Sequence, residues 1–181
     1  MSREATRVLI VEDKKDLATA YSKVLSKEYD VTTAIGGAQA LEMVDESADI
    51  VLLDRRMPGI SGDEVLATIR DRGLSVAVGL ITAVEPAADI LEMDLDEYVL
   101  KPIDNEELLT LVAELVHRRA CSDDLRKYFA LASKRWAFEH ADRQDSAVYE
   151  TLTDRLEQAR QSLDTDPDAA SGPADPRTRE W

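Results

Sequence analysis

The chain has 181 residues, of which 37 are acidic and 22 basic, so its formal net charge at pH 7 is −15. This length suits one ordinary domain with a smaller second element, and 44% hydrophobic residues are enough for a packed core, which excludes wholesale disorder. The acidity disfavours a general nucleic-acid binder, because neutralising phosphates requires a basic surface. We expect no membrane contact, because no apolar run reaches spanning length and the charged start lacks a signal peptide's apolar stretch.

The cysteine and lysine content bears on the cellular setting. Cys121 is the single cysteine and cannot form an internal disulfide, which fits a reducing cytoplasm. Only 7 of the basic residues are lysine, and high acidity with few lysines is compatible with a halophile, in which salt screens the repulsion between acidic groups. A merely acidic cytosolic protein fits the composition equally well.

The first 120 residues alternate between two hydrophobic patterns. Short apolar runs, typical of strands in a parallel sheet covered on both faces, lie at 8–11, 31–34, 50–53, 76–81 and 98–100. Between them, apolar residues recur at helical spacing over 17–25, 38–44, 65–69 and 108–116. Asp104 and Glu107 predict a capping box that opens the last of these helices. The alternation predicts an α/β fold over residues 1–120, a doubly wound domain with a parallel five-stranded sheet. Its fourth helix, near 86–92, is short and weakly patterned.

After residue 120 the strand signals stop. Ser122, followed by two aspartates, predicts a helix start, and apolar residues then recur at helical spacing from Leu125 to Trp136. A polar break at 142–146 precedes a second stripe from Val148 to Leu163. Over 121–163 we expect a helical hairpin, or a coiled coil formed by one long interrupted helix. Its narrow apolar faces must pack on each other, on the first domain or on another chain. Residues 164–181, rich in Asp, Pro, Ala and Gly, are predicted to form a disordered tail.

Acidic residues follow two of the predicted strands. Glu12 and Asp13 come directly after the first strand, and Asp54 directly after the third. Ligand sites in doubly wound folds lie beyond the carboxyl ends of the strands, so these three side chains converge if the two strands are neighbours. Crowded carboxylates raise at least one pKa unless a cation neutralises them, and such oxygen ligands suit Mg2+. The alternative is that Glu12 and Asp13 merely cap the following helix and that Asp54 is an ordinary turn residue.

Two further polar residues end strands of the same sheet. Thr82 ends the fourth predicted strand, and Lys101 follows the fifth. A metal held by the carboxylates would polarise a phosphoryl group while a carboxylate attacks it, which leaves an acyl phosphate. Lys101 would supply positive charge, and Thr82 a hydroxyl, to the phosphoryl oxygens.

Taken together, four motifs resemble the receiver domain of two-component response regulators, which is a flavodoxin-like (βα)5 fold. They are Glu12-Asp13, the segment 54–59 (DRRMPG), Thr82-Ala83 and Lys101-Pro102, and the resemblance covers residues 7 to about 118. It implies that Asp54 is the phosphoacceptor and takes its phosphoryl group from a histidine kinase. It also implies that Mg2+ is bound by Asp13, Asp54 and the backbone carbonyl of Arg56, with Glu12 assisting.

The same resemblance makes Thr82 and Tyr98 a pair that rearranges on phosphorylation. Tyr98 lies three residues before Lys101, at the aromatic position of receivers. Its alternative role is that of an ordinary half-buried aromatic residue. One departure from the receiver pattern is the spacing from Thr82 to Lys101, which is 19 positions, about three shorter than usual and nearly one helical turn. The fourth helix is therefore expected to be truncated, which puts in doubt the receiver dimer built on that helix.

The C-terminal region resembles a narrower family. The segment LRKYFALASKRWAFE within 121–163 resembles the HalX domain, which follows receivers in haloarchaeal regulators. The resemblance implies a haloarchaeal two-component regulator.

The leading functional hypothesis is a phosphorylation-controlled switch rather than a turnover enzyme. Its output would be the C-terminal helices, through a homodimer or an unknown downstream protein. A DNA-binding transcriptional regulator is the alternative. It is disfavoured because the basic residues of the C-terminal region are balanced by acidic ones and because the region has no helix-turn-helix pattern. A magnesium-dependent aspartyl-phosphate phosphatase is less favoured still. Such enzymes carry an acid two residues after the nucleophile, where this chain has Arg56.

Overall fold

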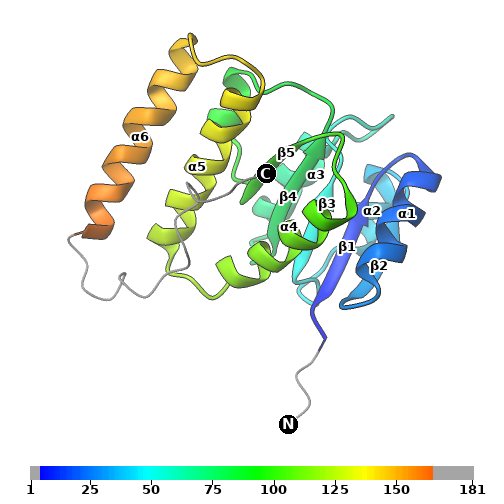
Figure 1. The fold of residues 1–181 in the computed structure, drawn as a ribbon. Helices are drawn as coiled ribbons and strands as arrows, with labels where there is room; N and C mark the ends of the chain where they lie inside the picture. Colours follow the sequence, from blue (N-terminus) through cyan, green and yellow to red (C-terminus); the bar gives the residue numbers. More distant parts are fainter. Residues whose placement is uncertain (1–4, 165–181) are drawn as a thin grey trace.

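The computed structural model describes residues 5–164, and they form one five-stranded sheet with helices on both faces, followed by a helical pair (Figure 1). The predicted fold class is thereby confirmed. The elements are β1 Arg7–Val11, α1 Lys15–Leu25, β2 Asp30–Ala34, α2 Gly37–Met43, β3 Ile50–Leu53, α3 Gly62–Asp71, β4 Ala77–Thr82, the 3-10 turn η1 Ala88–Glu92, β5 Glu97–Leu100, α4 Asn105–Arg118, α5 Asp123–His140 and α6 Ala147–Asp164. The tail predicted from residue 164 onward lies outside the described residues, apart from Asp164 itself.

The strand order in the sheet is β2-β1-β3-β4-β5, and all four pairings are parallel. The central strands β3 and β4 are buried along their whole length, because helices cover both of their faces. β1 pairs directly with β3, with Val11 opposite Leu53. The residues that follow these two strands therefore come to the same edge of the sheet.

The helices divide between the two faces of the sheet. α1 and α4 cover one face, where Leu25, Leu111 and Leu115 pack against inward side chains of β1 and β3. α2 and α3 cover the other face, where Ala40 and Ile69 lie in a second apolar cluster. α4 begins with the predicted capping box, since the Asp104 carboxylate accepts from the N–H of Glu107 and the Glu107 carboxylate accepts from the N–H of Asp104.

The link between β4 and β5, residues 83–96, contains only the five-residue turn η1. We call this segment the β4–β5 connection. The sequence predicts a truncated fourth helix here, and the structure has only this 3-10 turn in its place. On this side of the sheet β5 needs cover from another part of the chain.

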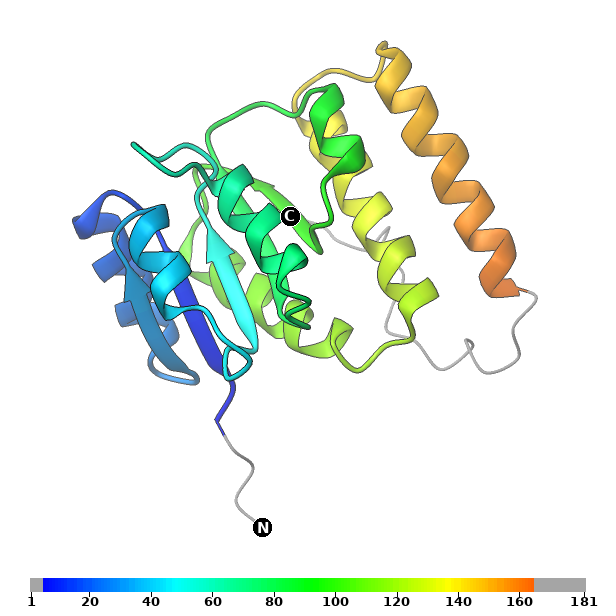
Figure 2. The ribbon, with the colours of Figure 1, turned by 180° about the vertical axis from the view of Figure 1, so that it is seen from behind.

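That cover comes from α5, which runs beside β5, with α6 packed on the outer side of α5 (Figures 1 and 2). Phe138 and Leu152 of the helical pair belong to the same apolar cluster as Ile90 of η1 and Tyr98 of β5. α5 starts at the predicted cap, Ser122, whose hydroxyl accepts from the N–H of Leu125. The apolar stripes of the two helices thus pack on each other and on the first domain. The predicted division into 1–120 and 121–163 stays a prediction.

Among residues 5–164, no helix combines the length and the apolar character that crossing a membrane requires.

Candidate phosphoryl site

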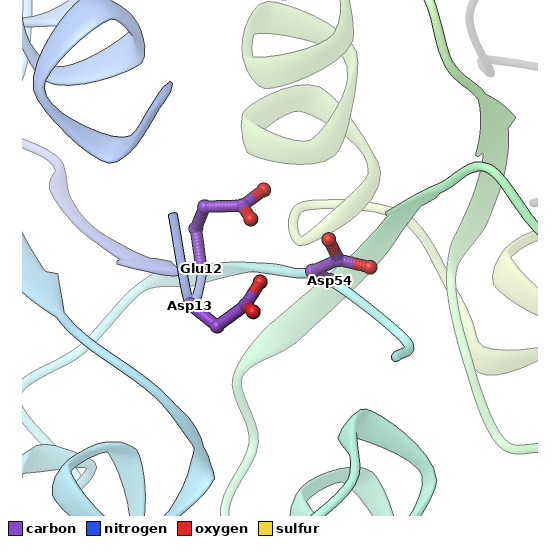
Figure 3. Close-up of side chains that lie close together, drawn as sticks. All are labelled: Glu12, Asp13 and Asp54. Atoms are coloured by element: carbon purple, nitrogen blue, oxygen red, sulfur yellow. The ribbon is translucent and has the colours of Figure 1, made fainter. Parts of the chain in front are cut away.

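Three carboxylates meet at the ends of the neighbouring strands β1 and β3. Glu12 and Asp13 follow β1, Asp54 follows β3, and one oxygen from each lies within 4.8 Å of the others (Figure 3). Glu12 and Asp54 are buried, while Asp13 is half-buried at the opening. This cluster of hard oxygen donors fits the coordination that Mg2+ prefers, a few carboxylates completed by water and phosphate oxygens. The structure brings together the residues that the sequence predicts at this place.

Lys101 joins two of the carboxylates from across the sheet. Its ammonium lies 2.6 Å from Asp54 Oδ2 and 2.7 Å from Glu12 Oε2. Burial raises the pKa of the Glu12 carboxyl, and the charge of Asp54 adds to the rise, although hydrogen bonds from Lys101 and the Lys14 N–H oppose it. Burial works against the charged ammonium of Lys101, but its bonds to Asp54 and Glu12 outweigh this effect and raise the pKa of Lys101. The site therefore carries one fixed positive charge among three acidic groups.

Thr82 and Tyr98 converge on one backbone residue, Val84. The N–H of Val84 donates to Thr82 Oγ1 over 3.1 Å, and the hydroxyl of Tyr98 donates to the carbonyl of Val84 over 2.7 Å. Tyr98 is completely buried, and this burial raises the pKa of its phenol, which remains a neutral donor. Thr82 still has its own hydroxyl hydrogen to donate, and it lines the same cleft as Asp54. Tyr98 is therefore more enclosed than the half-buried alternative assumes.

Arg55, directly after Asp54, is a residue whose role the sequence reasoning missed. Its guanidinium pairs with Asp63 of α3 and with Asp89 of η1, and it lies 3.5 Å from the hydroxyl of Tyr98. Arg55 is buried, whereas its neighbour Arg56 is exposed and contacts the site through its backbone N–H, which donates to Asp54 Oδ1. Two adjacent arginines look alike in a sequence, so only the loop geometry separates them.

Gly62 allows α3 to begin against the backbone of Asp54 and Arg55. A Cβ at this position would clash with the backbone carbonyl of Asp54 and with Cα of Arg55. Nothing in the sequence pattern distinguishes this glycine from a turn residue, because the close approach involves backbone eight residues away.

A second polar network, also missed from the sequence, ties β5 to α4 and α5. Glu97 of β5 is buried and pairs with Arg118 of α4. Ser133 of α5 donates to Glu97 and accepts from the backbone N–H of Tyr98.

A neighbouring acidic residue is held in a similar way. Asp96, also buried, pairs with Arg70 of α3 and Arg126 of α5. Buried acidic residues at the start of a strand are a signal that could have pointed to cationic partners.

Comparisons with known proteins agree with this geometry. The family model described as "Response regulator receiver domain" matches residues 8–113, and the model described as "HalX domain" matches residues 117–175. A Haloferax volcanii protein named "Putative transcriptional regulator" is 44% identical over 157 residues, which are 84% of this chain and 27% of that protein. The sensory transduction protein RegX3 of Mycolicibacterium smegmatis is 41% identical over 66% of this chain and 54% of its own length.

A solved structure shows the same fold with a ligand. The response regulator TrrA of Thermotoga maritima, determined in complex with Mg2+-BeF, is 34% identical with a TM-score of 0.55, and the match covers 61% of this chain and 98% of TrrA. The chain thus spans between about a quarter and about half the length of the curated relatives described above.

Proposed function

Because this chain belongs to the response regulator receiver family and carries a HalX domain behind the receiver, we propose that it is a two-component response regulator switched by phosphorylation of Asp54. The observation that carries the proposal is the meeting of Asp54 with Asp13, Glu12 and Lys101 at the carboxyl edge of the sheet. The phosphoryl donor is a histidine kinase, and the reaction takes place in the cytoplasm.

In the proposed reaction, a carboxylate oxygen of Asp54 attacks the phosphorus of a phosphohistidine. The new O–P bond forms as the P–N bond breaks, and the leaving imidazole keeps the electron pair. Asp13, Asp54 and the backbone carbonyl of Arg56, with Glu12 assisting, would hold Mg2+. When bound, the metal neutralises charge on the transferring oxygens. Lys101 stabilises the same oxygens as a point charge, and Thr82 donates its hydroxyl hydrogen to one of them.

The consequence of phosphorylation would pass from Thr82 to Tyr98 through Val84, and from there to the helices packed on β5. We propose that the phosphoryl group changes how α5 and α6 are held, or their assembly into a homodimer. Phe138 and Leu152 of these helices are covered within the chain, so a dimer would form through other surfaces of the helical pair. Light scattering of the wild type and of Asp54→Ala, with and without beryllofluoride, measures such a dimer as a change in mass.

DNA binding through the C-terminal region has less support. Arg126 pairs with Asp96, Lys134 binds backbone carbonyls of the β4–β5 connection, and Arg143 binds the carbonyl of Pro86. These cations are used inside the molecule, so they do not form a free basic surface for phosphates. A gel shift at high ionic strength checks this directly, and strong sequence-specific retention would favour the DNA-binding function instead.

The phosphoacceptor is tested by mass spectrometry of the intact chain after incubation with acetyl phosphate and Mg2+. We expect one added phosphoryl group in the wild type, labile to hydroxylamine as an acyl phosphate is, and none in Asp54→Asn. Asp71→Asn, an exposed aspartate at the end of α3, is the matched control and should be modified like the wild type. Equal modification of Asp54→Asn would contradict the proposal.

A further inference from the structure

The β4–β5 connection forms part of the wall of the phosphoryl site. The cleft around Asp54 is lined by Val84, Glu85, Ala87 and Asp89 of this segment. Val84 is held at both of its backbone groups, since its N–H donates to Thr82 and its carbonyl accepts from Tyr98. Any shift of this segment therefore also shifts the hydrogen-bond partners of Thr82 and Tyr98, the two residues of the proposed switch.

This segment has little structure of its own to fix it. Its regular part is a 3-10 turn of five residues, η1, in which hydrogen bonds are fewer and poorer than in an α-helix. From the side of the phosphoacceptor, Arg55 holds η1 through its ion pair with Asp89. Arg70 of α3 holds the end of the connection through the carbonyl of Asp94 and the carboxylate of Asp96. Further restraints come from the C-terminal helical region.

Besides Arg126, which pairs with Asp96, three cations of the C-terminal helical region hold residues 86–93 of the connection. Lys134 of α5 donates to the carbonyls of Met93, over 2.6 Å, and Leu91, over 3.4 Å. Arg143, in the loop after α5, donates to the carbonyl of Pro86 over 2.9 Å, two residues beyond Val84. Arg155 of α6 pairs with Glu92 at 3.2 Å. Backbone carbonyls accept these bonds regardless of side-chain identity, so they restrain the path of the chain itself.

Lys134 is the strongest of these restraints because it is buried. Its side chain is only 5% exposed, and an ammonium is rarely placed so deep unless it is fully paired. The shortened connection leaves carbonyls that an α-helix would have bonded internally, and the Lys134 ammonium is among their partners. The helices that follow the receiver thus replace part of the missing fourth helix, in packing and in hydrogen bonding.

We propose that Lys134 and Arg143 are positioning residues for the phosphoryl site. By fixing the β4–β5 connection they hold Val84, and through it Thr82 and Tyr98, in the arrangement that receives a phosphoryl group on Asp54. This inference rests on the proposed function and deepens it, because it makes the HalX region a part of the acceptor site as well as a possible output. Coupling between two sites is reciprocal, so a phosphoryl group on Asp54 in turn stabilises the contacts of α5 with the connection.

The experiment measures the affinity of the full chain for beryllofluoride in saturating Mg2+ by calorimetry. We expect the dissociation constant to rise about five- to tenfold, at the lower end of typical coupling between sites, in Lys134→Met and in Arg143→Gln. The affinity for Mg2+ alone should stay unchanged in both variants, since its proposed ligands lie in the segments directly after β1 and β3. A general loss of structure would weaken the binding of both Mg2+ and beryllofluoride. Arg143→Lys, which keeps a donor, should recover most of the affinity.

A control variant and the exposure of Arg143 make the test specific. Lys127→Met removes an exposed lysine of α5 that pairs only locally with Asp124, and it should bind beryllofluoride like the wild type. Arg143 is 44% exposed, so Arg143→Gln remains informative even where Lys134→Met does not fold. Hydrogen exchange in α5 of the wild type should slow when beryllofluoride binds.

Unchanged or tighter beryllofluoride binding in a folded Arg143→Gln, or faster exchange of α5 on binding, would overturn this inference and leave the proposed function standing. A wild type that binds no beryllofluoride, or an Asp54→Asn variant that binds it equally, would overturn the proposed function and this inference with it.

Discussion

The backbone N–H of Tyr98 in β5 donates a 2.8 Å hydrogen bond to the side-chain hydroxyl of Ser133 in α5. β5 is the last strand of the sheet, so its outward N–H groups have no neighbouring strand to bind. The same hydroxyl donates to the buried carboxylate of Glu97. One serine therefore satisfies the strand edge at the residue proposed to respond to phosphorylation, and it attaches α5 there.

We expect Ser133→Ala to lower the free energy of unfolding by about 1–3 kcal/mol, because it leaves a buried N–H and a buried carboxylate short of a partner. Urea unfolding followed by circular dichroism measures the loss. Lys127→Ala, an exposed change on the same helix, should stay within about 0.5 kcal/mol of the wild type. A Ser133→Ala variant as stable as the wild type would show that water replaces the hydroxyl.

Mg2+ should stabilise the folded chain through the carboxylate cluster. At a concentration one hundred times its dissociation constant, a ligand that binds only the folded state adds about 2.7 kcal/mol to the free energy of unfolding. We expect this gain in the wild type and its loss on adding a chelator. Asp13→Asn should remove most of the gain, because Asp13 is one of the three clustered carboxylates.

The matched control for this measurement is Asp16→Asn, an exposed acid in the first turn of α1. It should keep the full Mg2+ effect, since Asp16 is not part of the cluster. An equal Mg2+ effect in Asp13→Asn and the wild type would place the metal elsewhere.

Arg55 and Arg56 offer a contrast between adjacent arginines. Arg55→Gln removes the ion pairs with Asp63 and Asp89, and we expect it to cost about 1.5–3 kcal/mol, the usual range for hydrogen bonds to charged groups. Hydrogen exchange of η1 should accelerate, because η1 loses the ion pair between Asp89 and Arg55. Arg56→Gln, at an exposed side chain, should leave stability and exchange nearly unchanged. Equal effects of the two substitutions would argue against this role for Arg55.

Much of the molecule follows from patterns that a sequence shows directly. The parallel sheet is predictable because both faces are covered and the strands read as short apolar runs. Glu12, Asp13, Asp54 and Lys101 were found because parallel strands place their carboxyl ends at one edge, so that residues far apart in the chain meet there.

The contacts that depend on how elements dock were not predictable from the sequence. Ser133 and Lys134 occupy a helical face, and spacing alone does not show that this face lies against β5 and the β4–β5 connection. The short spacing before Lys101 indicates a truncated fourth helix, but it does not show which residues cover β5 instead. From the sequence, Lys134 is one basic residue among several in a region of balanced charge. In the structure it is buried and restrains the neighbouring backbone.

The ionisation of Lys134 gives a pH dependence with a definite sign. Burial lowers the pKa of this amine to about 8, with Arg155 adding to the fall and with Asp94 and Glu92 opposing it. The unfolded chain, with an ordinary lysine pKa near 10.4, binds more protons between about pH 8 and pH 10.4, so the free energy of unfolding rises with pH across this window. Lys134→Met lacks this contribution. Between pH 7 and pH 9.5, the free energy of unfolding of the wild type should therefore rise by about 2 kcal/mol more than that of Lys134→Met. Urea unfolding at the two pH values measures this difference. Lys127→Met, at an exposed amine of the same helix, should show the wild-type pH profile, and a constant difference between wild type and Lys134→Met would mean that the amine titrates normally.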